Sequence, residues 1–512
     1  MKKATDLQLT IESLEEKIEQ REQLIIQHEK VIAQRDTLIA LLQEKLRLAD
    51  IVRFAAKSEK SSSDQLGIFD EAELDQILEE PIKTEKTLVK SHVRKARPRT
   101  SIPKDLPRED IVYDIPDAQK ICPNDGAALE YAGSDDHEQL DIIPAQIKVI
   151  RHKRLKYACP CCKKYIATAS KPQQPIEKSI ASPGLLAFVA TQKYADALPL
   201  YRQSEIFKRI GVELDRTNLA NWMIKCGQLA QPLINLILEH IQQQPVIHMD
   251  ETTVQVLKEP DRKAQNKSYM WLMGVFNHQP ALVFHYSPTR NQQVPLTLLS
   301  STTQAIMIDG YQGYERACGE YDIQRLGCWA HARRKFIEAQ KAQNKNKSGK
   351  ADVAISFIQK LYAIERKTAD SPPDKRLEIR KNEAVPILQK FKAWLDKTLL
   401  NTLPESLLGK ALAYVANQWQ RLVGFVCDGR FPIDNNRAEN AIRPFVVGRK
   451  NWLFSNSQAG ASASANLYSL IETAKINALN PHAYLQKIFT DLPQAESVED
   501  IERLLPWNVQ LG

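Results

Sequence analysis

The sequence predicts an α/β protein in which a mixed β-sheet with flanking helices carries a large helical insertion. Four β-rich runs lie between residues 245 and 310, and residues 340–425 are almost wholly helical in pattern. A third observation is the regular spacing of apolar residues over the first 50 positions. Since the chain has 512 residues, we expect about three or four folding units rather than one.

Residues 1–50 are predicted to form an oligomerising coiled coil. They contain no Pro or Gly, and apolar residues recur at every seventh position: Ile11, Ile18, Ile25, Ile32, Ile39 and Leu46. A second row, from Leu14 to Leu42, is interrupted by Arg21, His28 and Arg35. A coiled coil buries such a stripe against a second helix, and polar core positions fix register or partner number. The alternative is one long amphipathic helix folded onto the rest of the protein.

Residues 51–110 are predicted to be a polar and basic linker. The stretch is rich in Ser, Pro and Lys, and its basic part consists of Arg94, Lys95, Arg97 and Arg99 around Pro98. These residues fit a flexible arm that lies along DNA. They fit a solvated linker equally well.

Charge is unevenly distributed along the chain. Residues 1–80 hold 11 Lys and Arg against 18 Asp and Glu, whereas the remaining residues hold 59 against 44. A basic body favours a partner with a phosphate backbone, because Lys and Arg release the counterions condensed on it. No apolar run approaches the roughly 18 residues that cross a bilayer, and the first residues lack the apolar segment of a signal peptide. We therefore expect a cytoplasmic protein with no membrane partner.

Residues 111–170 are predicted to form a zinc-ribbon-like β module. Cys159 and Cys162 have the spacing of a turn that presents two thiolates to one Zn²⁺. Upstream, Cys122 is followed three residues later by Asp125 instead of a second Cys. The candidate structural zinc ligands are thus Cys122, Asp125, Cys159 and Cys162, with Cys161, His137 and His152 as substitutes. The alternative is a metal-free ribbon held together by its strands.

Residues 171–240 are predicted to be a helical DNA-binding region. Helix start signals occur at Ser182-Pro183 and at Asp215. The stretch from Leu200 to Ile224 has the outline of a helix-turn-helix with its turn at Gly211, and its second helix carries the candidate DNA contacts Arg216 and Asn218. An ordinary helical hairpin has the same outline.

Residues 241–460 are predicted to be the α/β core, with its helical insertion at about 340–425. The runs PVIHMDE, SYMWLMGVFN, ALVFHYS and AIMIDG are expected strands, the middle two joined as a hairpin. NQQVPLTLLS is an expected helix before the fourth strand, and IQRLGCWAHARRKFIEAQ supplies a short strand and a basic helix. Residues 461–512 are predicted to be a C-terminal helical segment.

Three carboxylates stand out in this core. Asp250 and Asp309 each follow a short apolar run that is expected to end there as a strand, and Glu439 lies in a helical run. Taken singly, each Asp is an ordinary turn or cap residue. Together they can hold two Mg²⁺ (or Mn²⁺) ions, which clamp the attacking and leaving oxygens of a phosphodiester. Their order along the elements is that of ribonuclease H-like phosphoryl-transfer enzymes.

Basic residues flank the third carboxylate and the basic helix. Arg443, Arg449 and Lys450 follow Glu439, and Arg333 and Arg334 lie in the CWAHARRKF run beside His331. We predict that these Arg and Lys side chains contact the DNA backbone. A solvated basic face explains them about as well.

The chain resembles the TnpC-type DDE transposases of the insertion sequence 66 family. The resemblance rests on the leucine-zipper-like start, FAAKSEKSSSDQLGIFDEAE, the Cys-rich segment, SPGLLAFVATQKYADALPLYRQSEIFKRIG, HMDET, MIDGYQGY, CWAHARRKF and NNRAENAIRPFVVGRKNWLFSNS. It implies a ribonuclease H-like core with Asp250, Asp309 and Glu439 as the metal-binding triad. Asp125 departs from the family's usual second Cys, which bears on zinc binding and not on catalysis.

The activity implied by the resemblance is DNA transposition. The enzyme would bind the terminal inverted repeats of a bacterial insertion sequence, hydrolyse a phosphodiester at the end, and join the freed 3′-hydroxyl to target DNA. It would act near the nucleoid, as an oligomer, with or without accessory proteins of the same element. Two rivals are a catalytically inactive DNA-binding relic that represses transposition and a self-associating scaffold.

Overall fold

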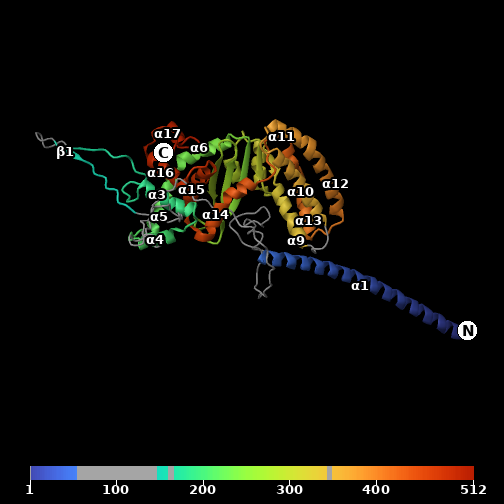
Figure 1. Ribbon diagram of the computed structural model, residues 1–512. Coiled ribbons are helices and arrows are strands. Elements are labelled where there is room, and N and C mark those ends of the chain that lie inside the picture. The colour runs from blue at the N-terminus through green and yellow to red at the C-terminus, as the bar shows by residue number, and fades with distance from the viewer. Residues whose placement is uncertain (1, 55–146, 159–165, 343–348, 512) are drawn as a thin grey trace, which may run out of the picture. The chain divides into compact units, whose positions relative to one another are not determined.

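The computed structural model describes residues 2–54, 147–158, 166–342 and 349–511. The chain divides into two compact units, residues 80–171 and a larger unit made of residues 1–79 and 172–512. The larger unit contains the long helix α1 and the mixed α/β body (Figure 1). Among the described residues no helix combines the length and the apolar character that a membrane span requires.

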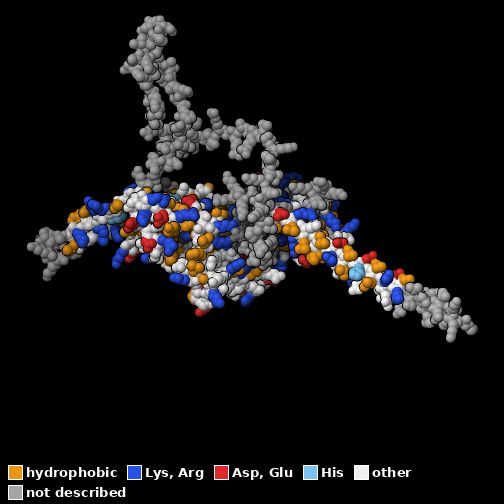
Figure 2. Space-filling model, turned by 90° about the horizontal axis from the view of Figure 1, so that it is seen from below, with side chains coloured by type: hydrophobic (Ala, Val, Ile, Leu, Met, Phe, Trp, Pro, Cys, Tyr) orange, Lys and Arg blue, Asp and Glu red, His pale blue; other side chains and the backbone are white. Residues whose placement is uncertain are grey.

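Helix α1 (Lys2–Phe54) is a single uninterrupted helix. From Ile18 onward its seventh-position apolar side chains are open to solvent, with Ile25 and Ile32 each 56% exposed and Leu46 63% exposed. Figure 2 shows apolar side chains, in orange, interspersed with charged ones along this helix. The predicted helix is therefore confirmed, and its apolar row is left without cover by the described part of this chain.

In the smaller unit, the described residues contain one short antiparallel ribbon. Strand β1 (Lys156–Ala158) pairs with β2 (Ile166–Thr168), with Tyr157 opposite Ala167. The described residues 147–155 of the predicted β module form no strand. The ribbon nevertheless brackets the segment that holds Cys159 and Cys162 in the sequence.

The body is built on one mixed sheet. Its strands are β3 (Val246–Lys258), β4 (Lys267–Val275), β5 (Ala281–Ser287), β6 (Ala305–Ile308), β7 (Gln324–Gly327) and β8 (Ser455–Ser457). The order across the sheet is β5-β4-β3-β6-β7, and β8 pairs with the far end of β3. The first three are antiparallel, whereas β6 is parallel to β3 and β7 is parallel to β6. The predicted strands and the hairpin are confirmed, and β8 was not foreseen.

Along the sequence, helices precede the strands of this sheet, lie between them and follow them. Before it come α3 (Pro183–Tyr194), α4 (Leu200–Arg209), α5 (Arg216–Leu229) and α6 (Gln231–Gln242). Within it lie α7 (Gln293–Leu298), the 3-10 turn η3 (Gln312–Tyr314), α8 (Glu315–Tyr321) and α9 (Trp329–Ala342). After it come α14 (Asn436–Trp452), α15 (Gln458–Ile476), α16 (Pro481–Asp491), η6 (Leu492–Gln494) and α17 (Val498–Glu502).

The predicted helical insertion is confirmed. Its described elements are α10 (Lys350–Lys367), α11 (Pro373–Ile379), the π-helical turn η4 (Arg380–Ala384), α12 (Val385–Leu400), α13 (Leu407–Leu422) and the 3-10 turn η5 (Val423–Val426). The stacked rings of Phe357 and Phe391, 5.0 Å apart, and the edge-on ring of Trp419 form its core. Figure 1 shows the insertion on the β7 side of the sheet and α15 on the β5 side.

Strand β6 divides two hydrophobic cores. Ile306 and Ile308 belong to the core that contains α3, α5, α14 and α15, whereas Ala305 and Met307 belong to the core of the insertion. Successive side chains of a strand point to opposite faces, and a parallel strand is usually covered on both. The face that Met307 shares is therefore the one covered by α9 and the insertion.

Strand β5 is an edge strand that helix α15 covers. Thr473 Oγ1 donates to the backbone oxygen of Leu282 and accepts from its N–H, at 2.9 and 3.0 Å. Ser469 Oγ accepts from the N–H of Phe284 at 2.8 Å. An uncovered edge presents unpaired backbone groups to other chains, so these hydroxyls close the sheet on this side.

Candidate active site

Asp250 and Asp309 lie abreast on neighbouring parallel strands. Ile247 pairs with Ile306 and His248 with Met307, and continuing this register by two residues brings Asp250 opposite Asp309. Neighbouring strands are about 4.8 Å apart, and side chains two residues apart point to the same face. The register therefore places both carboxylates on the face covered by α9. The prediction that a strand ends at Asp250 is wrong, because β3 continues to Lys258; Asp309 does follow the last residue of β6.

Glu439, in the first turn of α14, completes this group of carboxylates. It is 8% exposed. Burial and the nearby charges of Glu251, Asp309 and Glu439 raise the pKa of Asp250 well above its usual range. Like charges raise each other's pKa only when they are close and poorly screened. The three predicted carboxylates are therefore close together, with Glu439 buried and both Asp residues partly buried.

A fourth carboxylate, Glu251, is already neutralised by its neighbours. Arg290 donates to Glu251 Oε1 through Nε at 2.8 Å, and the Tyr314 hydroxyl donates to Oε2 at 2.6 Å. The Arg290 guanidinium also stacks 3.6 Å from the centroid of the Tyr311 ring. Being adjacent to Asp250 in a strand, Glu251 points to the opposite face. It is therefore a structural group beside the site.

Asn435 joins the start of α14 to strand β3. Its side chain donates to the backbone oxygen of Met249 at 2.8 Å and accepts from Nδ1 of His248 at 3.0 Å. Asn435 is 1% exposed, and burial lowers the pKa of His248 to about 4, so the ring is neutral at pH 7. Asn435 thus makes no side-chain cap on its own helix. Its bonds instead fix Glu439 relative to Asp250.

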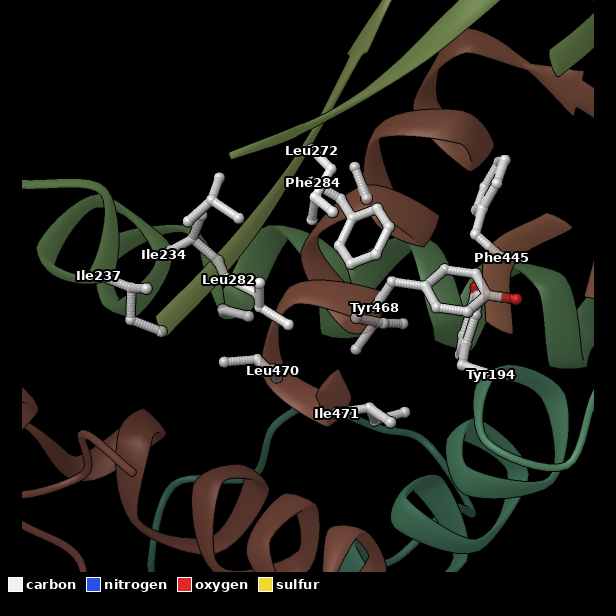
Figure 3. Packing of buried hydrophobic residues seen from close by; sticks show 14 of the residues in the cluster. Tyr194, Ile234, Ile237, Leu272, Leu282, Phe284, Phe445, Tyr468, Leu470 and Ile471 are labelled. Atoms are coloured by element: carbon white, nitrogen blue, oxygen red, sulfur yellow. The ribbon is translucent and has the colours of Figure 1, made fainter. Parts of the chain in front are cut away.

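The middle and end of α14 are also tied to the sheet and its neighbours. Phe445 packs edge-on against Tyr468, with ring centroids 5.2 Å apart, and Tyr468 in turn lies 5.6 Å from Phe284 (Figure 3). Near its end, Arg449 donates to Thr253 Oγ1 at 2.9 Å and to the Thr253 backbone oxygen. These contacts hold α14 along the face of β3.

Helix α9 supplies a second set of side chains around Glu439. Arg334 Nη2 donates to Glu439 Oε2 at 3.1 Å, and His331 Nδ1 lies 3.5 Å from Glu439 Oε1. The Cys328 thiol, just before α9, accepts the backbone N–H of Asn435 at 3.3 Å. Cys328, His331 and Glu439 have ligand atoms within 4.8 Å of one another.

The predicted DNA-binding residues outside the end of α14 lie on α5, on α9 and in the first half of α14. Arg216 and Asn218 are exposed in the first turn of α5, which follows α4 through a turn with Gly211 at φ +83°. A positive φ of this kind favours glycine. Arg334 and Arg443 are partly buried beside Glu439, and Arg333 is partly buried on α9. Helices α4 and α5 therefore have the predicted helix-turn-helix outline.

A pocket of about 480 Å³ lies beside the end of α14. Its lining consists of Thr253, Val254, Gln255, Gln265, Asn266, Lys267, Arg449, Lys450 and Leu453. Three of these side chains are basic, and the lining begins three residues along β3 from Asp250. Leu453, at φ +67° and 63% exposed, stands at its rim.

The predicted zinc ligands Cys122, Asp125, Cys159 and Cys162 lie outside the described residues, as do Cys161 and His137. His152 is described and is exposed. The structure therefore does not test the zinc prediction.

Sequence reasoning missed several residues of the site. Glu251 follows Asp250 directly, and Asn435 and His248 are polar residues within otherwise apolar segments. Cys328 and His331 were not among the predicted site residues. Their i, i+3 spacing at a helix start was the available signal, since residues three apart share a helix face.

Family models match nearly the whole chain. "Transposase IS66 family" matches residues 178–463, and "IS66 C-terminal element" matches residues 469–507. "Zinc-finger binding domain of transposase IS66" matches residues 119–163, and "Transposase C of IS166 homeodomain" matches residues 41–111. The first match contains all three predicted carboxylates.

Three uncharacterised proteins of Sinorhizobium fredii (strain NBRC 101917 / NGR234) are similar over most of their length. Protein y4jD is 31% identical over 420 residues, covering 80% of this chain and 81% of the relative. Protein y4qI is 31% identical over 81% of this chain and 78% of its own, and y4hP is 28% identical over 85% and 81%. The matched domains indicate a DNA transposase, and the chain belongs to the IS66 family of transposases.

Proposed function

We propose that this transposase cleaves and joins DNA at Asp250, Asp309 and Glu439, which hold two Mg²⁺ or Mn²⁺ ions. The observation that carries the proposal is the register of β3 and β6, which brings two Asp side chains abreast on the face that Glu439 approaches. Three carboxylates from three elements are a ligand set that hard divalent cations prefer.

The electrostatics of the site fit such ions. Asp250 is partly buried beside Asp309 and Glu439, and its pKa is raised by removal from water and by repulsion from the nearby carboxylates. A divalent cation would relieve that repulsion, because it pairs with the deprotonated form. Ions held by Asp250, Asp309 and Glu439 would supply activation of the attacking oxygen and stabilisation of the leaving oxygen. The protein's own part is to hold the three carboxylates in place through β3, β6 and α14.

The sheet supports a ribonuclease H-like interpretation of the fold. Three antiparallel strands are followed by two strands parallel to the first, in the order β5-β4-β3-β6-β7. The first acidic residue lies on the central strand and the second directly after its parallel neighbour. The helical insertion then separates the second carboxylate from Glu439 without disturbing the sheet.

Basic side chains are placed to bind DNA near these carboxylates. Lys450 is exposed, and Lys267 and Arg449 line the pocket beside the end of α14. Lys and Arg side chains are scattered over the face of the body in Figure 2. Arg216 and Asn218 on α5 would contact a separate stretch of the element's end, as the second helix of a helix-turn-helix does. Together these residues would hold terminal repeat and target DNA.

The exposed row on α1 supports assembly through a coiled coil. Ile18, Ile25, Ile32 and Ile39 are each about half exposed, between 49% and 57%. Burying this row in a second copy would release about 25 cal/mol for each Å² of apolar surface. We expect Ile25→Asp with Ile32→Asp to reduce the oligomer to monomers in sedimentation, whereas the same change at the neighbouring Gln27 and Gln34 leaves it intact. An unchanged oligomer in the Ile variant would contradict this assembly.

The test of the proposed chemistry is a strand-transfer assay with labelled element ends. Purified protein should cleave the 3′ end and join it to target DNA with Mg²⁺, and EDTA should stop both steps. Asp250→Asn should abolish cleavage while DNA binding, measured by mobility shift, stays within about twofold. Asp261→Asn is the matched control, because Asp261 is an exposed acid of the β3–β4 connection at φ +56°, a conformation that Asn tolerates.

Two results would contradict the proposal. Cutting and joining by the Asp250→Asn variant would remove the triad from the chemistry. The DNA-binding relic would be favoured if the protein bound DNA without metal but never cleaved it. That result must hold both with and without extracts that contain the element's other proteins.

A further inference from the structure

Cys328, His331 and Glu439 form a compact cluster of different donor atoms. A thiol, an imidazole nitrogen and a carboxylate oxygen lie within 4.8 Å of one another, in the part of the chain that the structure describes. Cys328 immediately precedes α9 and His331 lies in its first turn, so their spacing of three residues turns both side chains to one face. Glu439 approaches that face from α14.

The two oxygens of Glu439 have different surroundings. Oε2 accepts from Arg334 at 3.1 Å. Oε1 faces Nδ1 of His331 at 3.5 Å, and both atoms are buried without a hydrogen-bond partner in the described structure. Glu439 is 8% exposed. Buried polar atoms without a hydrogen-bond partner are uncommon because they forgo the hydrogen bonds that water would supply. These two atoms, which face each other, are therefore placed to share one cation.

The thiol is also arranged as a ligand. Cys328 is 1% exposed, and its sulfur accepts the backbone N–H of Asn435 at 3.3 Å. That N–H is held in place because the Asn435 side chain bonds Met249 and His248. A donor directed at a ligating sulfur is a common outer-sphere feature of thiolate metal sites.

We propose that Cys328, His331 and Glu439 bind one thiophilic divalent cation of the Zn²⁺ class. Thiolate and imidazole select such cations, whereas Mg²⁺ prefers oxygen ligands alone. Three protein ligands leave a fourth position open, as in zinc sites that bind water or substrate. The site shares Glu439 with the proposed carboxylate site, but binding of a cation here does not depend on whether the protein transfers DNA strands. It is distinct from the predicted zinc ribbon at Cys159 and Cys162.

The competing explanation of the same geometry is an ion pair between protonated His331 and Glu439 beside a core thiol. The two explanations differ in whether sulfur contacts a metal. Co²⁺ reports this directly, because a cobalt–thiolate bond adds a charge-transfer absorption in the near ultraviolet that oxygen and nitrogen ligands do not give.

The experiment uses full-length, metal-stripped protein in which Cys122→Ser, Cys159→Ser, Cys161→Ser and Cys162→Ser remove the ribbon thiols. Titration with Co²⁺ should give the charge-transfer band with one equivalent bound. Adding Cys328→Ser should eliminate the band, and His331→Gln should weaken Co²⁺ binding at least tenfold. Cys318→Ser is the matched control, since Cys318 is a buried thiol outside the cluster and should leave the band unchanged.

The proposal would be overturned if the variant without the ribbon thiols gave no charge-transfer band, or if the band persisted after Cys328→Ser. Circular dichroism checks folding, and if Cys328→Ser fails to fold, the partly exposed His331 position provides the decisive titration. Asp250→Asn should keep the cobalt band while losing strand transfer. A band in a protein that never transfers strands would thus uphold this inference and count only against the proposed function.

Discussion

The strands that carry Asp250 and Asp309 and the helix that carries Glu439 are held in different ways. Backbone pairing between β3 and β6 fixes the two Asp residues, and Ile247 opposite Ile306 sets the register. Glu439 has no such ladder. Its position depends on side chains at the start, middle and end of α14, namely Asn435, Phe445 and Arg449.

Substitutions elsewhere in the protein should therefore displace the two Asp residues less easily than Glu439. A strand register slips only by moving every side chain of the strand to the other face. A helix can shift by an ångström when one polar contact is lost, and such a shift can cost much of a reaction rate. Side chains far from Glu439 in sequence should therefore control its part in the reaction.

The largest effect should be the difference in activity between two variants, one that lacks the triad carboxylate Glu439 and one that lacks the nearby carboxylate Glu251. Glu439→Gln should lower strand transfer by at least roughly 10³-fold, the loss seen when an electrostatic group at a reacting centre is removed. Glu251→Gln should keep activity within about tenfold, because Arg290 and Tyr314 already neutralise that carboxylate, and should cost about 1–3 kcal/mol of stability. Rates of 3′-end joining and denaturant unfolding measure the two effects. Equal losses of activity would make Glu251 a fourth member of the site.

A smaller effect is expected when α14 is loosened from β3. Asn435→Ala removes two buried side-chain hydrogen bonds and leaves His248 unpaired, so we expect about 2–4 kcal/mol less stability. Strand transfer should fall about 10- to 100-fold, as when an outer-sphere partner of a metal ligand is removed.

The control for the Asn435 variant is a substitution of the next residue, Asn436. Asn436 is exposed, and its amide bonds Asp434 at 2.9 Å. Asn436→Ala should change stability by less than about 1 kcal/mol. If the Asn436 variant lost as much activity as the Asn435 variant, the anchoring to β3 would not be the cause.

The smallest effect is on the pH dependence of stability. The folded protein raises the pKa of Asp250, so this group favours folding when protonated and opposes it once pH rises through the raised pKa. In EDTA at pH 8, Asp250→Asn should therefore be more stable than the wild type, and the gap should narrow as pH falls. Urea unfolding at pH 5 to 8 measures the gap. His248, whose pKa is lowered to about 4, destabilises both proteins equally below its unfolded pKa near 6.5 and cancels from the comparison. A gap that does not vary with pH would contradict the carboxylate cluster.

Much of the body could be predicted from its patterns. The runs that became β4, β5 and β6 are dense in β-branched and aromatic residues, and the insertion has helical spacing throughout. The end of β3 could not be placed, because residues after Asp250 alternate polar and apolar and continue the strand to Lys258. Strand β8 has three polar residues and forms only because the end of α14 delivers it to β3.

The candidate site was predictable where its residues stand in a local sequence pattern. Acidic residues after apolar runs suggested Asp250 and Asp309, and a helix start suggested Glu439. Arg334 was interpreted as a DNA contact, yet its guanidinium lies on Glu439. Nothing local in the sequence connects Asn435 with His248, which are 187 residues apart.

Most helices and strands, the family and the three acidic residues could be predicted from the sequence, because periodicity and short motifs are local properties. The tertiary structure alone decided that Asp250 lies opposite Asp309 and that Asn435 bonds β3. It alone brought Cys328 and His331 to the buried side of Glu439. These relations join segments more than 50 residues apart, and the packing of α9 and α14 against the sheet sets them. Such packing depends on the whole core, so no single stretch of residues encodes it.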